Sequence, residues 1–342
     1  MKVLTCAGYY KSGSSAVADL MSEFENVYSF GNYEFGLLKS RDGISDLEYN
    51  LIDNPHRVNS GYAIKKYCEN VKAWRGTVFF PKCEKLFKGQ FALISEEYIS
   101  ELTNFTYSGY FPIDIKDRGK WYYFIDRALY HLVKKAGSMW NIIFNRKGKP
   151  RKMVKFHLTR RNKVFLPKRV SREEFLACTR RYLTKLFEVA SDKEYVMADQ
   201  MIPINNYARY KRYFDDIKCV VVDRDPRDVF IYVKHILNER NVPYQRIEQF
   251  CEWYRYSHEI VEKDPEVLYI RFEDLVLNYE EYVKKVIDFY GVEKSEHKYQ
   301  YKFFQPEISK QGIGMWKKYP EEATNIGYIE EHLKEYLYVN SQ

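Results

Sequence analysis

Short apolar runs separated by amphipathic stretches recur along this chain. Three of them predict buried strands, at residues 3–7, 195–199 and 218–222. Apolar positions at helical spacing follow the first run over residues 17–24 and the third run over residues 229–237. Strands that alternate with helices predict an α/β fold with a mainly parallel, doubly wound sheet flanked by helices.

The middle of the chain has a different pattern. Residues 36–150 contain no long strand pattern, are rich in Tyr, Lys and Phe, and include amphipathic stretches at 46–52 and 62–74. They predict a largely helical insertion. The sequence Ser171-Arg172-Glu173-Glu174 is a capping box, which predicts a helix running to about Ala190.

A glycine- and serine-containing turn follows the first predicted strand and opens the first predicted helix. Such a turn directs backbone N–H groups and the positive end of a helix at one point, which favours an anion such as phosphate or sulfate. The lysine of this turn precedes its second glycine, whereas a nucleotide triphosphatase loop has lysine after it, so a metal-dependent nucleotide triphosphatase is disfavoured. The candidate anion-binding residues are Gly8, Lys11, Ser12, Gly13, Ser14 and Ser15.

The order Lys-Ser-Gly-Ser-Ser resembles the 5′-phosphosulfate loop of sulfotransferases that use 3′-phosphoadenosine-5′-phosphosulfate (PAPS). The turn after the third strand, Asp223-Arg224-Asp225-Pro226-Arg227-Asp228, resembles the family turn whose arginine binds the 3′-phosphate. By this resemblance Arg224 grips that phosphate with its planar fork. Tyr232 stands where the family places a serine as a second 3′-phosphate ligand.

Two C-terminal segments add to the resemblance. Residues 267–275 resemble the family strand that ends in Tyr/Phe-Glu-Asp-Leu, and the helix behind them is predicted to stop at Gly291. Residues 310–317 resemble the loop that closes over the nucleotide, which implies nucleotide contacts from Lys310, Gly312, Gly314 and Trp316. For Trp316, core packing is an equally good interpretation.

The resemblance covers residues 1–35 and about 195–320. It implies one sulfotransferase domain over residues 1–342 with a P-loop-like core, in which 195–320 form the 3′-phosphate-binding half and 36–150 recognise the acceptor. PAPS is then the co-substrate and PAP the product, with no metal. Lys11 would neutralise the leaving phosphate oxygens, while the serines and the Gly13 N–H hold the 5′-phosphate.

Transfer to a hydroxyl also needs a general base. Glu34 follows the first helix at an offset where several relatives carry a catalytic glutamate. His157, in Lys155-Phe156-His157-Leu158, resembles the segment that holds the base of the small-molecule enzymes. The spacing from Lys11 favours Glu34, with His157 as the alternative base or as an acceptor contact.

The formal net charge of +8 is concentrated in one region. From Arg127 to Arg172 the chain has 15 Lys or Arg residues and no Asp or Glu. Such a region attracts anions. It predicts a carbohydrate acceptor, anionic or neutral, such as a surface polysaccharide or its lipid-linked precursor, and peripheral contact of residues 146–172 with an anionic membrane surface. Nucleic acid is the weakest candidate, because no recognisable binding module is present.

Six scattered cysteines lack metal-ligand spacing and suit buried thiols in a reducing compartment. The chain enters a strand at once and has no apolar stretch of membrane-spanning length, so we expect a cytoplasmic enzyme, peripheral at the inner membrane face. Two other functions remain open. One is an ATP- and Mg²⁺-dependent kinase of related fold, and the other is a non-catalytic polyanion-binding protein.

Overall fold

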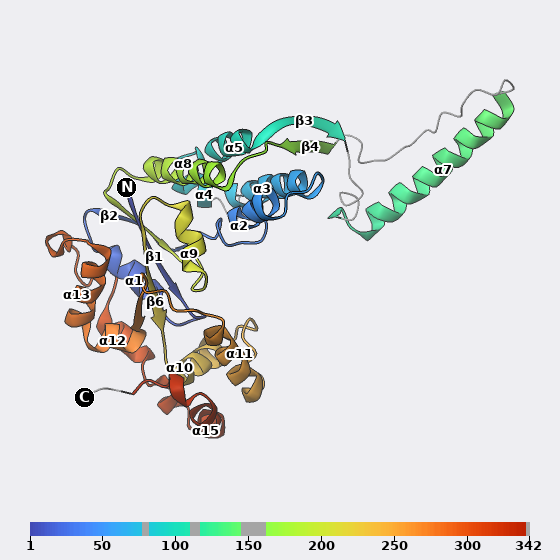
Figure 1. Cartoon of the computed structure of the whole chain (residues 1–342). Helices are drawn as coiled ribbons and strands as arrows, with labels where there is room; N and C mark the ends of the chain where they lie inside the picture. The colour runs from blue at the N-terminus through green and yellow to red at the C-terminus, as the bar shows by residue number, and fades with distance from the viewer. Residues whose placement is uncertain (77–81, 110–116, 145–161, 340–342) are drawn as a thin grey trace.

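The computed structural model of the protein describes residues 1–76, 82–109, 117–144 and 162–339 (Figure 1). Five strands form a sheet in the order β2-β5-β1-β6-β7, and every pairing in it is parallel. The strands are β1 (Lys2–Gly8), β2 (Val27–Glu34), β5 (Tyr195–Asp199), β6 (Ile217–Asp223) and β7 (Leu268–Arg271). The predicted α/β class with a mainly parallel sheet is confirmed.

The sheet is buried on both faces, which explains the continuous apolar runs of its central strands. All five residues of β5 are buried, as are residues 3–7 of β1. Val3 of β1 pairs with Val196 on one side and with Ile217 on the other. This register brings the carboxyl ends of β1, β5 and β6 to one edge of the sheet, where ligands bind in open parallel sheets.

Helices cover the sheet in three groups. The first packs on β1 and β6 and consists of α1 (Ser15–Met21), α12 (Phe272–Leu277) and α13 (Tyr279–Tyr290). The second shares a core with the opposite face and includes α8 (Arg172–Ala190) and α9 (Tyr207–Tyr210). The third lies beyond the carboxyl ends of the strands and comprises α10 (Pro226–Ile231), a π-helical turn (Tyr232–Leu237), α11 (Ile247–Glu259) and α15 (Ala323–His332).

Two predicted helix ends are present as expected. Ser171 caps α8 in a capping box, because its hydroxyl accepts from the Glu174 N–H at 3.2 Å while the Glu174 carboxylate accepts from the Ser171 N–H at 2.7 Å. Gly291 ends α13 in the left-handed conformation, with φ +74°. By contrast, β7 ends at Arg271, and residues 272–275 open α12 where the sequence predicted the end of a strand.

Residues 36–150 are helical at most described positions. The helices are α2 (Ile44–Glu48) with a π-helical turn (Tyr49–Asp53), α3 (Asn59–Arg75), α4 (Lys82–Leu86), α5 (Phe91–Leu102) and α7 (Lys120–Phe144). The region also contains β3 (Thr103–Gly109), which pairs antiparallel with β4 (Asn162–Pro167). The prediction that this region lacks a strand was therefore wrong at residues 103–109. Residues that favour strands alternate there with polar residues, and the strand they form pairs with β4, which follows α7 in the chain.

Figure 1 shows α7 extending away from the rest of the protein, beyond the β3–β4 pair. Within the described ranges, no helix is both long enough and apolar enough to cross a membrane.

Candidate active site

The turn between β1 and α1 is shaped by close backbone approaches. A Cβ on Gly8 would lie 2.3 Å from the Ser12 hydroxyl, and a Cβ on Gly13 would lie 2.6 Å from the Phe272 ring. Lys11 and Gly13 both have positive φ, at +58° and +88°. The Ser12 hydroxyl donates to the Val222 carbonyl at 2.6 Å and so ties the turn to β6. These contacts hold the turn in one curved conformation.

The curved turn leaves backbone donors available. Among the described hydrogen bonds, none is donated by the N–H groups of Gly13, Ser14 or Ser15. Ser14 is buried, and its hydroxyl accepts from the Gln200 amide at 2.9 Å and lies 3.4 Å from an Asp199 carboxylate oxygen. Ser15 is the first residue of α1. Consecutive free N–H groups in such a turn form an anion-binding concavity.

Lys11 is held at the edge of this concavity by an ion pair. Its Nζ lies 3.3 Å from Glu239, which also accepts a hydrogen bond from the Tyr10 hydroxyl. The same Nζ lies 5.1 Å from the centre of the Tyr10 ring. Both partners of the ion pair are partly exposed. A phosphate bound in the turn would compete with Glu239 for this lysine.

Arg224 follows β6 on the other side of the turn and is buried. Its Nη2 donates to the Gly312 carbonyl at 2.6 Å. Its Nε is also buried and has no hydrogen-bond partner among the described residues. An unsatisfied donor on a buried guanidinium is costly, and a phosphate oxygen is the partner that its fork fits best.

The ring of Phe272 connects the two candidate phosphate sites. Its centre lies 4.9 Å from the Arg224 guanidinium, and the same ring is the neighbour that excludes a Cβ at Gly13. Gly312 also faces this ring, because a Cβ there would lie 4.0 Å from it and 2.9 Å from Arg224. The turn, Arg224 and the 310–316 loop therefore meet around this ring.

Asp228 fixes the 310–316 loop. Its carboxylate accepts from the backbone N–H of Gly314 at 2.8 Å and from that of Trp316 at 3.2 Å. The Trp316 ring lies 4.5 Å from the Arg227 guanidinium and packs with the α10–α11–α15 cluster. Lys310 is exposed and forms no ion pair within the described ranges.

Tyr232 lies on the π-helical turn after α10, with its ring 5.5 Å from the Arg224 guanidinium. The structure thus places it beside the arginine with which it was predicted to act. Its hydroxyl has no described hydrogen bond.

A network behind the turn supports β1 and β6. His258 stacks on Tyr9 at 3.7 Å between ring centres and bonds to Asp223 at 3.1 Å. Arg271 donates to the other oxygen of Asp223 at 2.9 Å. Burial acts to raise the pKa of Asp223, but the His258 hydrogen bond and the Arg271 charge prevail and hold this pKa below its ordinary value. These contacts fix the positions of Tyr9 and Asp223, which lie at the ends of β1 and β6 beside the turn.

Glu34 is the last residue of β2 and pairs in register with Asp199 of β5, whose carboxylate contacts Ser14 of the turn. The Glu34 side chain is exposed. Lys39 is close to both acids. Burial lowers the pKa of Lys39, although the negative charges of Glu34 and Asp199 act to raise it. His157, the other candidate base, lies outside the described residues, as do residues 146–161 of the basic segment.

Sequence patterns did not single out Asp199, Lys39, Glu239 or Phe272 as parts of the site. Each reaches it through the parallel sheet or a distant loop. Among the described residues, no group of three or more His, Cys, Asp or Glu side chains is arranged to hold a metal ion.

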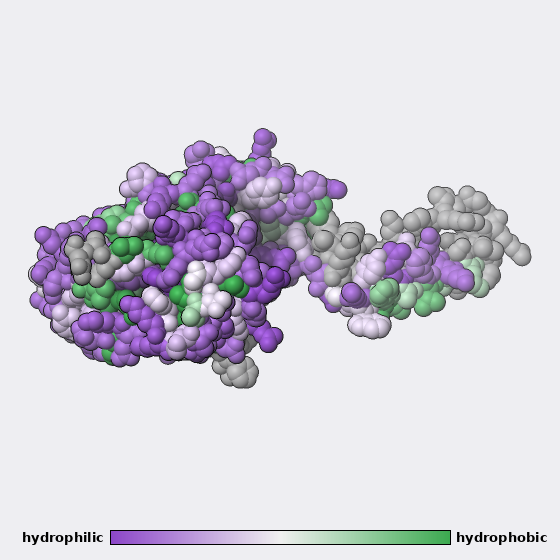
Figure 2. All heavy atoms as spheres, turned by 90° about the horizontal axis from the view of Figure 1, so that it is seen from below, coloured by the Kyte–Doolittle hydropathy of each residue, from purple (hydrophilic) through white to green (hydrophobic). Residues whose placement is uncertain are grey.

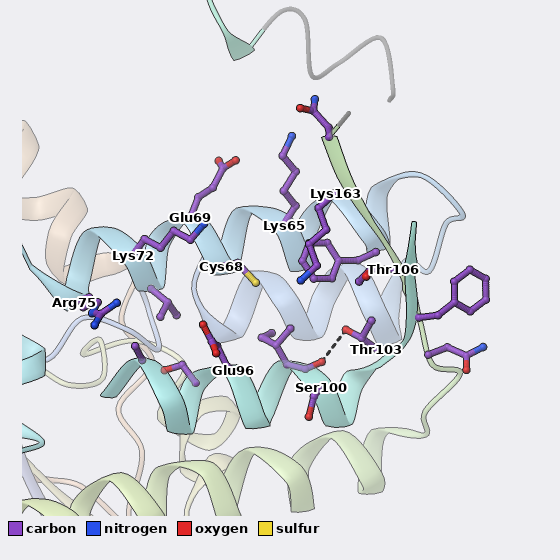
Figure 3. Close-up of a pocket in the computed structure, with 18 residues that line it drawn as sticks. Lys65, Cys68, Glu69, Lys72, Arg75, Glu96, Ser100, Thr103, Thr106 and Lys163 are labelled. Atoms are coloured by element: carbon purple, nitrogen blue, oxygen red, sulfur yellow. Dashed lines mark hydrogen bonds between the residues drawn. The ribbon is translucent and has the colours of Figure 1, made fainter. Parts of the chain in front are cut away.

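A second feature is a cavity of about 830 Å³ between α3, α5 and the β3–β4 pair (Figure 3). Lys65, Lys72, Arg75 and Lys163 lie around it, and Cys68 points between the two helices. Phe105 and Phe165 add aromatic surface. None of the residues of the phosphate turn or the Arg224 site lines this cavity.

Residues 139–296 match the model of the sulfotransferase family. This segment is therefore similar to sulfotransferase sequences. The match includes Arg224, Tyr232 and Phe272 but not the phosphate turn at residues 8–15. It confirms the predicted family resemblance and the prediction of a sulfotransferase enzyme. No curated protein sequence matches the chain significantly.

Solved sulfotransferase structures also resemble this chain, at low identity. The sulfotransferase domain of the Synechococcus PCC 7002 olefin synthase is 13% identical to this chain, with a TM-score of 0.41, and the alignment covers 92% of this chain and 87% of that domain. The sulfotransferase domain from the curacin biosynthetic pathway is 13% identical, with 87% and 76% covered and a TM-score of 0.37. A retinol dehydratase crystallised with androsterone and PAP is 13% identical, with a TM-score of 0.30, and the alignment covers 100% of this chain and 84% of the retinol dehydratase. Because these scores are low, the assignment rests on the family match and on the chain's own residues.

Proposed function

We propose that this protein transfers a sulfuryl group from PAPS to a hydroxyl of a carbohydrate acceptor. The observation that carries the proposal is the buried Arg224 guanidinium, whose Nε lacks a partner among the described residues. It lies across the Phe272 ring from a turn with free backbone N–H groups. Two anion sites bridged by an aromatic ring suit a nucleotide with phosphates at its 5′ and 3′ positions.

The residues present fit this co-substrate. The N–H groups of residues 13–15 would hold the 5′-phosphate, with the Ser14 and Ser15 hydroxyls beside them. Arg224 would hold the 3′-phosphate through its free donors, with Tyr232 and Lys310 as neighbouring contacts. Gly312 and Gly314 keep the covering loop close, because a side chain at Gly312 would meet Arg224.

When bound, PAPS supplies an activated sulfuryl group. The reaction breaks the bond between sulfur and the bridging phosphate oxygen and forms a bond between sulfur and the acceptor oxygen. Lys11, released from Glu239, stabilises negative charge on the leaving phosphate oxygens. Glu34 takes the proton of the acceptor hydroxyl. In such a transfer the protein acts chiefly by positioning and electrostatic stabilisation.

The carbohydrate part of the proposal rests on the basic, aromatic character of the acceptor region. The cavity between α3 and α5 has four cationic side chains near its rim and two phenylalanines in its wall. Aromatic rings stack on sugar faces and cations pair with acidic groups. Because this cavity is separate from the phosphate turn, it suits a remote part of a long acceptor. The six cysteines are all free thiols, which supports a reducing, cytoplasmic location.

A transfer assay tests this function. Labelled PAPS is incubated with the protein and with acidic polysaccharides, neutral polysaccharides and small phenols or steroids. We expect label on a polysaccharide and a loss of about 10²- to 10⁴-fold in kcat for Glu34→Gln, with PAP affinity retained. Glu188→Gln, on the exposed side of α8, is the matched control. Label transferred only to the small alcohols would contradict a carbohydrate acceptor, and full activity in Glu34→Gln would remove Glu34 as the base.

A further inference from the structure

Helix α7 exposes an apolar stripe to solvent. Trp121, Ile125, Leu132 and Met139 follow one another at spacings of four, seven and seven residues, which places them on one helical face. Their exposed fractions are 82%, 53%, 63% and 57%. Phe124 beside them is also exposed. Figure 2 shows green, hydrophobic surface along the lower side of the projecting part of the protein and purple, hydrophilic surface above it.

The opposite face of α7 is basic. Lys120, Arg127 and Lys134 recur every seven residues and so form a line along the helix. All three are exposed, as is Lys135 at the border of the stripe. The one acidic residue of the helix, Asp126, is buried. The polar face therefore presents positive charge only.

The position of α7 leaves this apolar stripe uncovered by the rest of the described chain. Figure 1 shows the helix projecting beyond the β3–β4 pair, away from the sheet and its covering helices. A contiguous exposed apolar surface of this kind marks an interaction site. Since the stripe is bordered by lysine and arginine, its partner combines an apolar interior with an anionic surface.

We propose that α7 lies in the plane of an anionic lipid bilayer, with its apolar stripe in the boundary between headgroups and acyl chains. Its basic side chains would then meet lipid phosphates and carboxylates. The 25-residue helix is too charged to span the bilayer, and its length suits lying on the surface. The sequence predicted contact of residues 146–172 with an anionic membrane surface, and the proposal adds α7 as the element that inserts into that surface. It does not depend on sulfuryl transfer.

A second copy of the chain is a less suitable partner for this stripe. Lys135 borders the apolar positions, so two α7 helices packed through the stripe would each place a lysine beside the seam. Like charges beside a helical seam oppose pairing. The apolar arc, widened by Phe124, also exceeds the narrow seam of a two-stranded coiled coil. An anionic surface turns the same charges into an attraction.

Co-sedimentation of the full chain with vesicles tests the proposal. Vesicles of phosphatidylcholine alone are compared with vesicles in which about 30% of the lipid is phosphatidylserine, which is anionic, and the rest is phosphatidylcholine. We expect strong binding to the anionic vesicles that weakens as salt is raised. The double variant Ile125→Glu, Leu132→Glu is expected to lose binding by roughly ten-fold or more, since both side chains leave the acyl boundary.

Controls separate this effect from general surface changes. Leu93→Glu alters an exposed apolar side chain on α5 and is expected to leave vesicle binding unchanged. Arg127→Gln with Lys134→Gln is expected to weaken binding about five-fold for each charge, whereas Lys284→Gln on α13 has no such effect.

Three results would overturn the proposal. The first is no binding to the anionic vesicles, and the second is equal binding by the α7 variants and the control variants. The third is a dimer of the original protein in sedimentation velocity that becomes a monomer in the α7 variants. PAP binding, measured on the same variants, is expected to be unchanged, so that a failure of the membrane proposal is distinguishable from a failure of the proposed function.

Discussion

At the scale of single residues, the ion pair of Lys11 with Glu239 sets how readily the phosphate turn accepts an anion. Glu239 contacts both Lys11 and Tyr10, so that a bound phosphate must replace its carboxylate at the lysine. We predict that Glu239→Gln binds PAP more tightly, by roughly two- to five-fold, because the competing charge is gone.

Titration calorimetry with PAP measures this change. Glu248→Gln, an exposed acid on α11, serves as the control for lost surface charge. Weaker binding by Glu239→Gln than by the control would mean that Glu239 assists the nucleotide site instead of competing with it.

Glu273 gives the protein a defined pH dependence. Burial raises the pKa of Glu273 to about 7, while Arg271 and the Asp225 N–H act to lower it. Because the folded-state pKa exceeds the unfolded value of about 4.3, this carboxyl favours folding most below pH 4.3, and the benefit is lost as pH rises to about 7. Glu273→Gln removes this dependence and keeps an oxygen acceptor for Asp225.

Denaturant unfolding at pH 5 and pH 8 checks this prediction. Relative to Glu273→Gln, the original protein is expected to lose on the order of 2–3 kcal/mol of unfolding free energy between these pH values. A difference that stays constant with pH would show that Glu273 is ionised throughout the range.

At the scale of elements, the turn between β1 and α1 depends on Gly13 for two separable reasons. Its φ of +88° suits glycine, and its missing side chain makes room for the Phe272 ring of α12. Gly31 in β2 shares only the first property, because its φ is +60° but nothing lies within 4 Å of its Cβ position. The pair therefore separates backbone strain from contact with the ring.

We predict that Gly13→Ala loses PAP binding and about 1–3 kcal/mol of stability, since both strain and displacement of Phe272 act on it. Gly31→Ala is expected to lose less stability and to keep PAP binding. Thermal unfolding with and without PAP gives both quantities. Equal PAP affinity in the two variants would show that the Phe272 contact does not shape the site.

The same elements show how far sequence patterns reach. Strands β1, β5 and β6 were predictable, because each is a short apolar run in a sheet buried on both faces. Strand β3 was not, because its partner β4 follows only after α7 and most of β3 is exposed. The start of α12 was also missed, since Phe272-Glu273-Asp274-Leu275 has no local signal separating a strand end from a first helical turn.

Site residues follow the same division. Lys11 and Arg224 could be predicted because each belongs to a turn directly after a strand, where the chemistry is local. Asp199 and Lys39 could not, because Asp199 reaches Ser14 only in the folded sheet and the charges of Glu34 and Asp199 act together on Lys39 only once β2 pairs with β5. Phe272 was missed because its contribution is the packing of its ring against Gly13 and Arg224, which only the folded structure shows.

At the scale of the whole molecule, the protein separates nucleotide chemistry from its wider contacts. The candidate active site lies at the carboxyl ends of the sheet, whereas the cavity beside α3 and the basic helix α7 belong to the region between β2 and β4. Net charge and composition indicated an anionic partner but not this arrangement. Of the described basic residues in this region, Arg127, Lys134 and Lys135 lie on α7, which projects from the rest of the protein.

The central claim is that the turn at residues 8–15 and Arg224 together hold a nucleotide with 5′- and 3′-phosphates. Thermal unfolding with PAP, with ATP plus Mg²⁺ and without ligand tests it most directly, because a ligand of the folded state raises the unfolding midpoint. We predict a rise with PAP that is lost in Lys11→Ala and Arg224→Ala and kept in Lys284→Ala. No response to PAP, or a response to ATP with Mg²⁺ alone, would contradict the account.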